Sequence, residues 1–321
     1  ESELQQLADH LRTHHHVDGG FVVRLLTGDL RIGLKEGLLE DALADAFDAA
    51  PAEIREAHML TGDLGETARL ASEGRLDEAE VRPFTPLKGM LASPEENGAA
   101  IWKRLGSTGG SVWLEDKFDG IRAQLHRVGD RVELFSRDLR PLHHEFTELI
   151  GPARALASDV ILDGEIIAYA EGKRLTFFDL QKRLGRRREG ELFFGEAIPV
   201  RFIAFDLLWS DGHSLLRRPL SERREALDRL TLPEGLDRVV VHPAASAKAI
   251  EAEFVAARKR DNEGLIAKDP TSLYLPGRRG KAWLKLKKAA ATLDVIVVKA
   301  QQGHGKRSHL LSDYTFAVRD D

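Results

Sequence analysis

The sequence predicts an α+β protein with a helical N-terminal part, a larger part built on antiparallel sheets, and the start of a further strand unit. Three observations lead to this prediction. Apolar residues in the first eighty positions recur at helical spacing, and from about Ser111 they alternate as in strands. Helical segments stand between those strands. A new strand, loop and strand then begin at about Thr292.

The N-terminal part shows its helical pattern most clearly in "LKEGLLEDALADAFDAA". One stripe of this segment carries its apolar residues, which are Leu38, Leu39, Ala42, Leu43, Ala46 and Phe47. Segments 51–60 and 64–74 continue the pattern, with a proline in the first turn of one and a glycine at the end of the other. The Pro- and Gly-rich segment 82–98 indicates a linker or the entry to the next domain.

The second part is rich in short strands. Two alternating runs, 121–128 and 131–137, are joined by Gly129-Asp130, which predicts a β-hairpin. Further strand-like runs are 160–170, 200–210 and 263–269, and helical periodicity occurs at 221–230 and 247–261. The unit that begins near Thr292 stops at Asp321, before it could close into a barrel.

Composition excludes several classes of site. The chain has no cysteine, so it has no disulfide framework, thiol nucleophile or cysteine-based zinc site, and it suits a reducing compartment. No apolar run is long enough to span a bilayer, so we expect no membrane partner.

Residues 1–100 carry nine basic and 20 acidic side chains, whereas 101–321 carry 38 basic and 32 acidic side chains. This asymmetry is a hint of polyanion binding in the basic part.

Four segments carry the candidate chemistry, in the order "EDKFDGIR", "LFSRD", "LDGEI" and "EGLIAKD…RRGKAWLKLK". A lysine before Asp-Gly is most often a solvated strand end. A lysine that attacks phosphorus instead needs a lowered pKa, Mg²⁺ held by carboxylates, cations for the phosphoryl charge and an aromatic face for a base. The sequence offers candidates for each role: Lys117, Glu165, Glu263, Phe205, Lys268, Lys285 and Lys287.

Taken together, these segments resemble the covalent nucleotidyltransferase superfamily, and specifically ATP-dependent DNA ligases. The signature K-x-D-G is Lys117-Phe118-Asp119-Gly120, and the resemblance runs from about Arg82 to the end of the chain. It implies that Lys117 takes AMP from ATP and releases pyrophosphate. AMP then passes to the 5′-phosphate of a nick in duplex DNA, and the 3′-hydroxyl displaces it. The implied cofactors are ATP and Mg²⁺ or Mn²⁺.

The resemblance also implies roles for individual residues. Glu115 would bind the adenine amino group, and Phe205 would stack on adenine. Arg122 and Arg137 would contact AMP or the nick phosphate. Glu165 would lie near the ribose and metal. The metal would also be bound by Glu263, and the triphosphate side would be lined by Lys268, Arg279, Trp283, Lys285 and Lys287. Asp138 stands where the family often has Asn, which leaves its role open.

The implied domains are a partial helical DNA-binding domain (1–80), an adenylation domain (81–291) and the beginning of an OB-fold (292–321). The basic motif that normally ends the OB-fold does not occur before Asp321. If the protein lacks that motif, we expect slow self-adenylylation from ATP, with later steps less affected. The runs "RRGKAWLKLKK" and "QKRLGRRR" are suited to contacts with duplex phosphates.

Three alternatives stay open. An RNA ligase or an mRNA-capping guanylyltransferase shares the lysine chemistry, and labelling with ATP against GTP would separate these classes. An NAD-dependent DNA ligase normally carries a four-cysteine zinc module. A catalytically silent DNA-binding relative would not need Lys117.

We expect a monomer inside the cell, located in the cytoplasm at the nucleoid if the source is a prokaryote. The sequence identifies neither the pathway (replication, repair or end joining) nor a sliding clamp or repair protein as partner.

Overall fold

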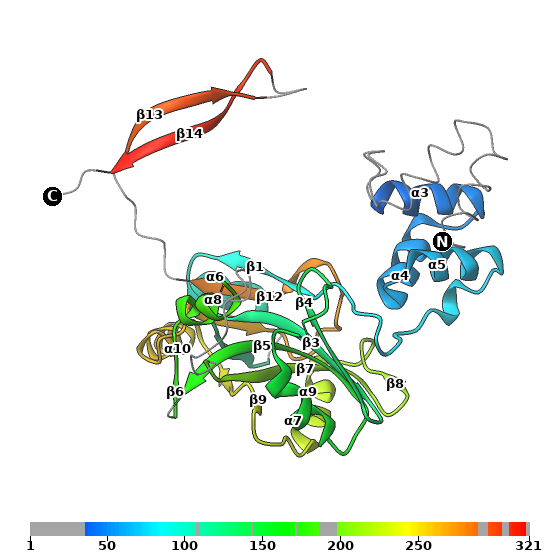
Figure 1. Cartoon of the computed structure of the whole chain (residues 1–321), viewed down its shortest axis with the longest axis horizontal. Helices are drawn as coiled ribbons and strands as arrows, with labels where there is room; N and C mark the ends of the chain where they lie inside the picture. Colours follow the sequence, from blue (N-terminus) through cyan, green and yellow to red (C-terminus); the bar gives the residue numbers. More distant parts are fainter. Residues whose placement is uncertain are drawn as a thin grey trace, which may run out of the picture. The chain divides into compact units, whose positions relative to one another are not determined.

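The computed structural model describes residues 36–106, 110–142, 144–170, 172–185, 198–287, 295–303 and 308–318. The chain divides into two compact units, and each unit is assembled from three stretches of sequence. The first unit takes in Glu1–Leu91, Gly120–Val239 and Pro270–Gly280. The second takes in Ala92–Asp119, Val240–Asp269 and Lys281–Asp321. Figure 1 labels their helices and strands.

The helical part of the first unit is described from Glu36 onward, and two of its helices have defined caps. It comprises α3 (Glu36–Ala46), α4 (Pro51–Thr61), α5 (Leu64–Ser72) and the 3₁₀ turn η1 (Leu76–Glu78). Gly62 ends α4 at φ 62°, where a glycine carries no steric penalty, and Asp63 caps α5 by accepting the Glu66 N–H. The helical prediction is confirmed from Glu36 onward, and residues 1–35 lie outside the described part.

The predicted buried stripe of 38–47 is confirmed only in part. Leu43 of this stripe is partly buried and packs against the core, whereas Leu38 is 55% exposed and Phe47 38% exposed. The buried core residue of α3 is Ala44, which the predicted stripe did not include. Ala44 packs with Ile54 and Ala71, because α4 and α5 are the helices that α3 contacts within the described residues. A pattern of period 3.6 fixes the spacing of a stripe, but the neighbouring helices decide which stripe is covered.

A seven-stranded sheet forms the main core of the first unit. Its strands run in the order β4-β3-β5-β7-β8, with β6 paired to β5 and β9 paired in parallel to β7. The strands are β3 (Ile121–Val128), β4 (Arg131–Ser136), β5 (Val160–Ala170), β6 (Lys173–Arg174), β7 (Val200–Ser210), β8 (His213–Ser214) and β9 (Leu236–Arg238). The unit also holds η3 (Thr147–Leu149), α7 (Ile150–Arg154), α8 (Phe177–Gly185) and α9 (Leu220–Arg229). The predicted hairpin at Gly129-Asp130 is confirmed as the β3–β4 connection.

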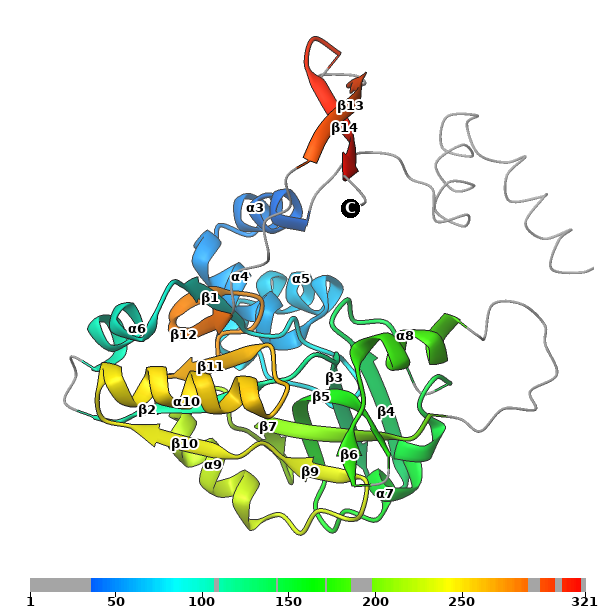
Figure 2. The ribbon, with the colours of Figure 1, turned by 90° about the vertical axis from the view of Figure 1, so that its left-hand side faces the viewer.

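A five-stranded sheet organises the second unit, in the order β1-β12-β11-β2-β10. Its strands are β1 (Leu91–Glu95), β2 (Val112–Lys117), β10 (Val241–Ala244), β11 (Gly264–Lys268) and β12 (Arg279–Lys287). Figure 2 shows α6 (Gly98–Leu105) and α10 (Ala247–Lys259) beside this sheet. Apolar side chains of both helices and of β2, β11 and β12 form one buried cluster. One face of the sheet is therefore covered by helices.

The last described elements are β13 (Val295–Gln302) and β14 (Leu311–Val318), which pair antiparallel. Every residue of these two strands is exposed. The predicted α+β class with antiparallel sheets is confirmed, and the hairpin is the described part of the predicted OB-fold. Among the described helices, none combines the length and the apolar character that crossing a membrane requires.

Candidate active site

Three adjacent strands of the five-stranded sheet carry six of the twelve predicted site residues on one face. Side chains alternate between the two faces of a strand, and directly paired residues share a face. The register pairs Lys117 with Gly264 and Gly264 with Lys287. Positions two and four residues away along each strand lie on the same face. We call this set the polar face, and its members are Trp113, Glu115, Lys117, Gly264, Ile266, Lys268, Trp283, Lys285 and Lys287.

The opposite face explains why this arrangement is fixed. The intervening residues Leu114, Leu265 and Leu284 are 0–1% exposed and belong to the core formed with α6 and α10. A slip of one residue in any strand would turn its leucines away from that core and its charged residues into it. Burial of the apolar residues of each strand therefore fixes where the charged residues of the same strand lie.

Lys117 lies at the end of β2 beside an acidic residue. The backbone N–H of Glu263, which directly precedes β11, donates to the carbonyl oxygen of Lys117 at 3.0 Å. The Lys117 ammonium lies 2.5 Å from Glu263 Oε2, and the Lys287 ammonium lies 2.8 Å from the same oxygen. Both are ion-pair distances, although neither contact has hydrogen-bond geometry. One carboxylate is thus shared by two lysines from the two flanking strands.

The two lysines change the acidity of Glu263. Partial burial by itself raises the pKa of this carboxyl group, but the ammonium groups of Lys117 and Lys287 outweigh that effect. The pKa of Glu263 therefore lies below its ordinary value. The side chains of Lys117 and Glu263 are 21% and 28% exposed, so a ligand can still reach both.

Gly264 is required by the close approach of the next strand. A Cβ atom at this position would overlap the carbonyl oxygen of Leu286 on β12. The glycine lets β11 and β12 pair directly after Glu263, and so it keeps the carboxylate between the two lysines.

A second charged pair is buried in the polar face. Lys268 and Glu115 are 1% and 4% exposed, and their side chains meet at 2.6 Å. The Lys268 ammonium also lies 4.1 Å from the ring centroid of Trp283. Burial of two opposite charges is tolerated because each is the partner of the other. Lys285 lies on β12 between Lys287 and Trp283. The strand register pairs it with Ile266 of β11, and Ile266 is in turn paired with Glu115 of β2.

The remaining predicted residues belong to the first unit. Glu165 on β5 is paired with Arg122 on β3. Phe205 lies at a β-bulge, because its neighbours on β7 pair with the consecutive residues Asp163 and Gly164 of β5. Phe205 is only half-buried within a mostly buried strand, and the Arg122 guanidinium lies 5.4 Å from its ring centroid. The other two, Arg137 and Arg279, are exposed, at the turn after β4 and at the start of β12.

Arg122 is held in a buried network that the sequence did not indicate. Its guanidinium donates to both carboxylate oxygens of Asp163, at 3.1 and 2.7 Å, and to the carbonyl oxygen of Met90 at 2.6 Å. The Tyr274 hydroxyl donates to Asp163 at 2.5 Å and accepts the Met90 N–H at 3.0 Å. Burial and the Asp163 carboxylate together raise the pKa of Tyr274, which keeps the phenol protonated. The only sign of this network in the sequence was Asp163, a carboxylate within an otherwise apolar strand, since a buried carboxylate needs a partner.

Gly120, the glycine of the K-x-D-G segment, also makes a close approach. A Cβ there would lie 2.5 Å from the carbonyl oxygen of Ile166 and 2.8 Å from Cγ of Glu165. Gly120 can therefore lie against β5 only because it carries no side chain.

The donor set for a metal is small. No group of three or more His, Asp or Glu side chains in the described residues is arranged to hold an ion. Mg²⁺, however, is commonly bound by one or two carboxylates together with substrate phosphates. The single carboxylate of Glu263 fits that mode of binding.

The run "QKRLGRRR", which was predicted to contact duplex phosphates, lies outside the described residues from residue 186 on.

Comparison with known proteins gives a consistent result. A family model of the ATP dependent DNA ligase domain matches residues 89–287. A probable DNA ligase of Opitutus terrae is 45% identical, and the match covers 100% of this chain and 37% of that protein. A probable DNA ligase of Koribacter versatilis is 44% identical over 93% of this chain and 55% of its own length.

One solved structure extends the comparison to the fold. Mycobacterial DNA ligase D complexed with ATP and MES matches with a TM-score of 0.50 and 28% identity. This match covers 67% of the present chain and 64% of the ligase D chain. The present chain spans between about a third and just over half of the length of the two curated relatives.

Proposed function

The chain belongs to the ATP-dependent DNA ligase family, and from this premise we propose that it seals nicks in duplex DNA through a lysine–AMP intermediate. The observation that carries the proposal is the position of Lys117, at the end of β2 with Glu263 Oε2 at 2.5 Å. A catalytically silent relative that only binds DNA would have no use for a nucleophile paired with a carboxylate.

The first step would form a bond between Lys117 Nζ and the α-phosphorus of ATP, and would break the bond from that phosphorus to pyrophosphate. Lys117 must lose a proton to attack, and the carboxylate of Glu263 is within reach to receive it. Lys287, and Lys285 on the same face, would stabilise negative charge on the departing phosphates.

In the later steps an oxygen of the 5′-phosphate would displace Lys117 from AMP, and the 3′-hydroxyl would then displace AMP and close the strand. Glu263 would contribute a carboxylate to Mg²⁺ or Mn²⁺ bound with the nucleotide. A bound ion supplies charge neutralisation at the phosphates. Glu165 as a second metal ligand, and the nucleotide contacts of Arg122, Arg137, Phe205 and Arg279, rest on the family resemblance.

The buried pair has a supporting part in this proposal. Glu115 is assigned to the adenine amino group, and its carboxylate can accept a hydrogen bond there while Lys268 holds it in place at 2.6 Å. Trp283 packs against the Lys268 ammonium and limits its movement. We therefore regard Lys268 and Trp283 as positioning residues for Glu115.

The wider proposals follow from the substrate. The domain assignment is 1–80 for DNA binding, 81–291 for adenylation and 292–321 for the start of an OB-fold, and the family match 89–287 lies within the second range. The partner is nicked double-stranded DNA, bound by a monomer. Its location is inside the cell with the DNA, at the nucleoid if the source is a prokaryote.

Labelling the intact protein with α-³²P nucleotides tests the function. We expect transfer of label from ATP to the protein, little transfer from GTP, and sealing of a nicked duplex. Labelling from GTP would favour the capping-type alternative. A wild-type protein that takes AMP but seals only nicked RNA would contradict the DNA substrate.

A further inference from the structure

The guanidinium group of Arg122 is held on several sides within the first unit. Asp163, on the neighbouring strand β5, is fully buried and accepts hydrogen bonds from both Nε and Nη2 of Arg122. The Tyr274 hydroxyl lies 3.4 Å from Nη2. The guanidinium carbon lies 5.4 Å from the ring centroid of Phe205, the residue that the family resemblance assigns to adenine. Arg122 thus has a defined position beside the expected nucleotide site.

Gly89 closes another side of the guanidinium group. A Cβ atom built on Gly89 would lie 2.6 Å from both Cζ and Nη2 of Arg122 and 2.9 Å from its Nε. These separations are shorter than any that real Cβ atoms make, so the guanidinium rests on this backbone only because glycine has no side chain. The φ angle of Gly89 is not positive. The guanidinium, and not the backbone conformation, is therefore what disfavours alanine at this position.

Gly89 belongs to a strap, residues 82–90, that is bonded to β3. Alternate residues of a strand share a face, and three alternate side chains of β3 hold the backbone of the strap. Their hydrogen bonds join Arg122 to the Met90 carbonyl oxygen at 2.6 Å, Gln124 to the Leu87 N–H at 3.0 Å and His126 to the Phe84 N–H at 2.9 Å. The segment predicted as a linker is therefore fixed along one face of β3.

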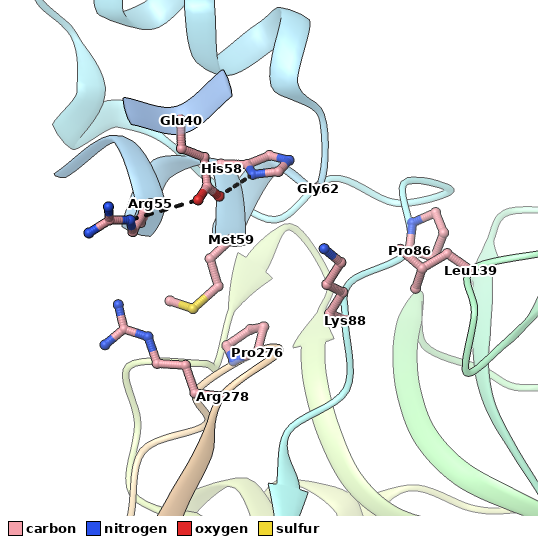
Figure 3. Close-up of a pocket in the computed structure, with 11 residues that line it drawn as sticks. Glu40, Arg55, His58, Met59, Gly62, Pro86, Lys88, Leu139, Pro276 and Arg278 are labelled. Carbon is pink, nitrogen blue, oxygen red and sulfur yellow. Dashed lines mark hydrogen bonds and ion pairs between the residues drawn. The ribbon is translucent and has the colours of Figure 1, made fainter. Parts of the chain in front are cut away.

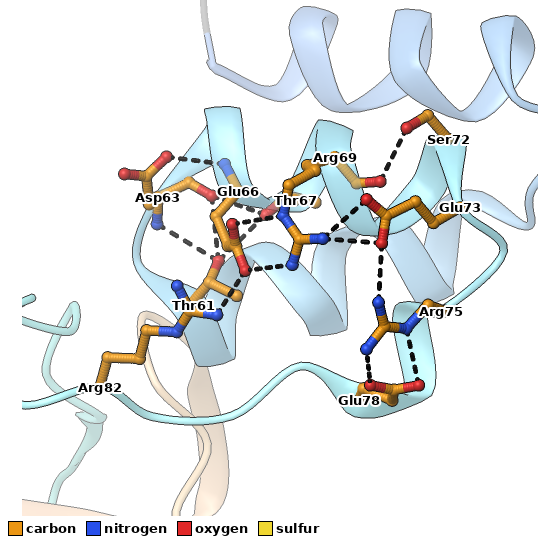
Figure 4. A network of polar contacts seen from close by, with 10 residues as sticks. All are labelled: Thr61, Asp63, Glu66, Thr67, Arg69, Ser72, Glu73, Arg75, Glu78 and Arg82. Atoms are coloured by element: carbon orange, nitrogen blue, oxygen red, sulfur yellow. Dashed lines mark hydrogen bonds and ion pairs between the residues drawn. The ribbon is translucent and has the colours of Figure 1, made fainter.

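The strap is also attached near both of its ends. Near its start, Arg82 forms an ion pair with Glu66 of α5 (Figure 4). Near its end, the Lys88 carbonyl oxygen accepts the Gly277 N–H at 2.7 Å. Figure 3 shows Lys88 in the wall of a cavity of about 300 Å³, which Arg278 of the same neighbouring segment also lines. These contacts fix the strap along its length, and with it the position of Gly89 against Arg122.

Tyr274 connects the two groups that hold the guanidinium. The residue is 2% exposed, and its hydroxyl donates to Asp163 at 2.5 Å and accepts the Met90 N–H at 3.0 Å. Asp163 holds Nε and Nη2 of Arg122, whereas Met90 holds Nη1. One hydroxyl therefore ties the carboxylate on β5 to the strap. Without it, the buried Met90 N–H would lose this acceptor, and the carboxylate would lose a donor.

The fixed guanidinium keeps one N–H available. Nη1 of Arg122 carries two hydrogens, and among the described residues it donates only to the Met90 carbonyl oxygen. The Arg122 side chain is 19% exposed, so a ligand can reach it. Because a guanidinium is planar, the orientation of its plane decides where each N–H points. We propose that Tyr274 and Gly89 are positioning residues, which fix this plane so that Arg122 can donate to a phosphate oxygen of the substrate. The assignment rests on the proposed function.

The kinetic test is a double-mutant cycle in the intact protein, with AMP loading and nick sealing each measured in single turnovers. Arg122→Lys keeps the charge but loses the planar group, and the step that it slows shows whether Arg122 serves AMP or the nick phosphate. In that step we expect Tyr274→Phe and Gly89→Ala each to be about tenfold slower than the wild type. Added to Arg122→Lys, each should slow the step by less than about twofold.

Tyr169→Phe is the matched control, because the Tyr169 hydroxyl on β5 forms no hydrogen bond with a described residue. It should leave both rates unchanged. Equal slowing by Tyr274→Phe and Gly89→Ala with and without Arg122→Lys would mean that they act through general stability, and this would overturn the proposal. Wild-type rates in both single variants, or in Arg122→Lys itself, would overturn it too.

A second measurement does not depend on catalysis. The Arg122 Nε–H signal can be identified in ¹⁵N NMR spectra by its loss in Arg122→Lys. We expect its exchange with solvent to be at least about tenfold faster in Tyr274→Phe and in Gly89→Ala than in the wild type. Unchanged exchange in both variants would contradict the positioning role. A wild-type protein that takes no AMP, yet shows these exchange differences, would sink the proposed function and leave the positioning of Arg122 supported.

Discussion

Glu263 is the side chain that links the two lysines of the polar face. Its carboxylate lies between Lys117 and Lys287, and its pKa is lowered by both of them, so it is ionised throughout the neutral range. An ionised carboxylate can hold the lysine in place, accept its proton, or bind a metal ion beside the phosphates. All three uses require the negative charge.

Replacing Glu263 with glutamine removes that charge and keeps the shape. We expect Glu263→Gln to slow AMP transfer to Lys117 by at least about 100-fold, in the range typical of a lost proton acceptor. Rapid-quench measurement of AMP loading checks this. Glu225→Gln on α9, which removes an exposed charge paired with Arg229, serves as control and should leave the rate unchanged. Equal rates in both variants would refute the role of Glu263.

His126 is a buried histidine with a pH-dependent consequence. Its Nδ1 accepts the Phe84 N–H at 2.9 Å, so the imidazole is neutral in the folded protein. Burial lowers the pKa of His126 from 6.5 to about 3. The unfolded chain therefore binds a proton below pH 6.5 that the folded chain does not. The stability contributed by neutral His126 is present above pH 6.5 and is lost as the pH falls toward 3.

The variant His126→Gln retains an acceptor for Phe84 but does not titrate. Between pH 6.5 and 4 the free energy of unfolding of the wild type should fall by up to about 1.4 kcal/mol per pH unit more than that of the variant. Denaturant unfolding at a series of pH values measures the difference. Parallel curves for the two proteins would show that His126 titrates normally.

At the scale of elements, the pairing of β2, β11 and β12 positions the site. Three alternating strands put their apolar residues under α6 and α10, and their charged residues then fall into rows on the other face. The position of each charged side chain is thus a consequence of core burial, which supplies most of the stabilising free energy.

Gly264→Ala tests that pairing. The added methyl group would overlap the Leu286 carbonyl oxygen, so we expect a loss of about 2 kcal/mol or more in the free energy of unfolding and slower AMP loading. Gly151→Ala on α7 is the control, because a Cβ there meets nothing within 4 Å and alanine favours helix. Guanidinium denaturation of both variants measures the effect. If Gly264→Ala left the free energy of unfolding unchanged, β12 would have to be able to shift away from β11 without loss of stability.

Several elements could be predicted from local sequence patterns. The alternating runs on either side of Gly129-Asp130 predicted the β3–β4 hairpin, and the helical period predicted α10. The strands β5 and β7 were predicted as apolar, β-rich runs, and both are buried along most of their length. The covered stripe of α3 was not predictable, since it depends on α4 and α5. The contact of Tyr274 with Asp163 joins residues 111 positions apart, and no local pattern reports such a pairing.

At the scale of the whole molecule, composition indicated only part of the charge distribution. The basic character of residues 101–321 was visible in the sequence, and it includes Lys285 and Lys287. Arg55 and Lys88, however, belong to the acidic first hundred residues, and in the structure they line one cavity together with Arg278. The distribution of charge along the sequence does not show which distant side chains meet in this way.

The central claim is that Lys117, among 47 lysines and arginines, is the residue that carries AMP. The most direct measurement is the intact mass of the protein after incubation with ATP and Mg²⁺, followed by peptide mapping of the modified residue. We predict a gain of one adenylyl group, located on Lys117, removed by pyrophosphate and absent from Lys117→Arg. No gain in mass, or AMP on a different side chain, would contradict the account.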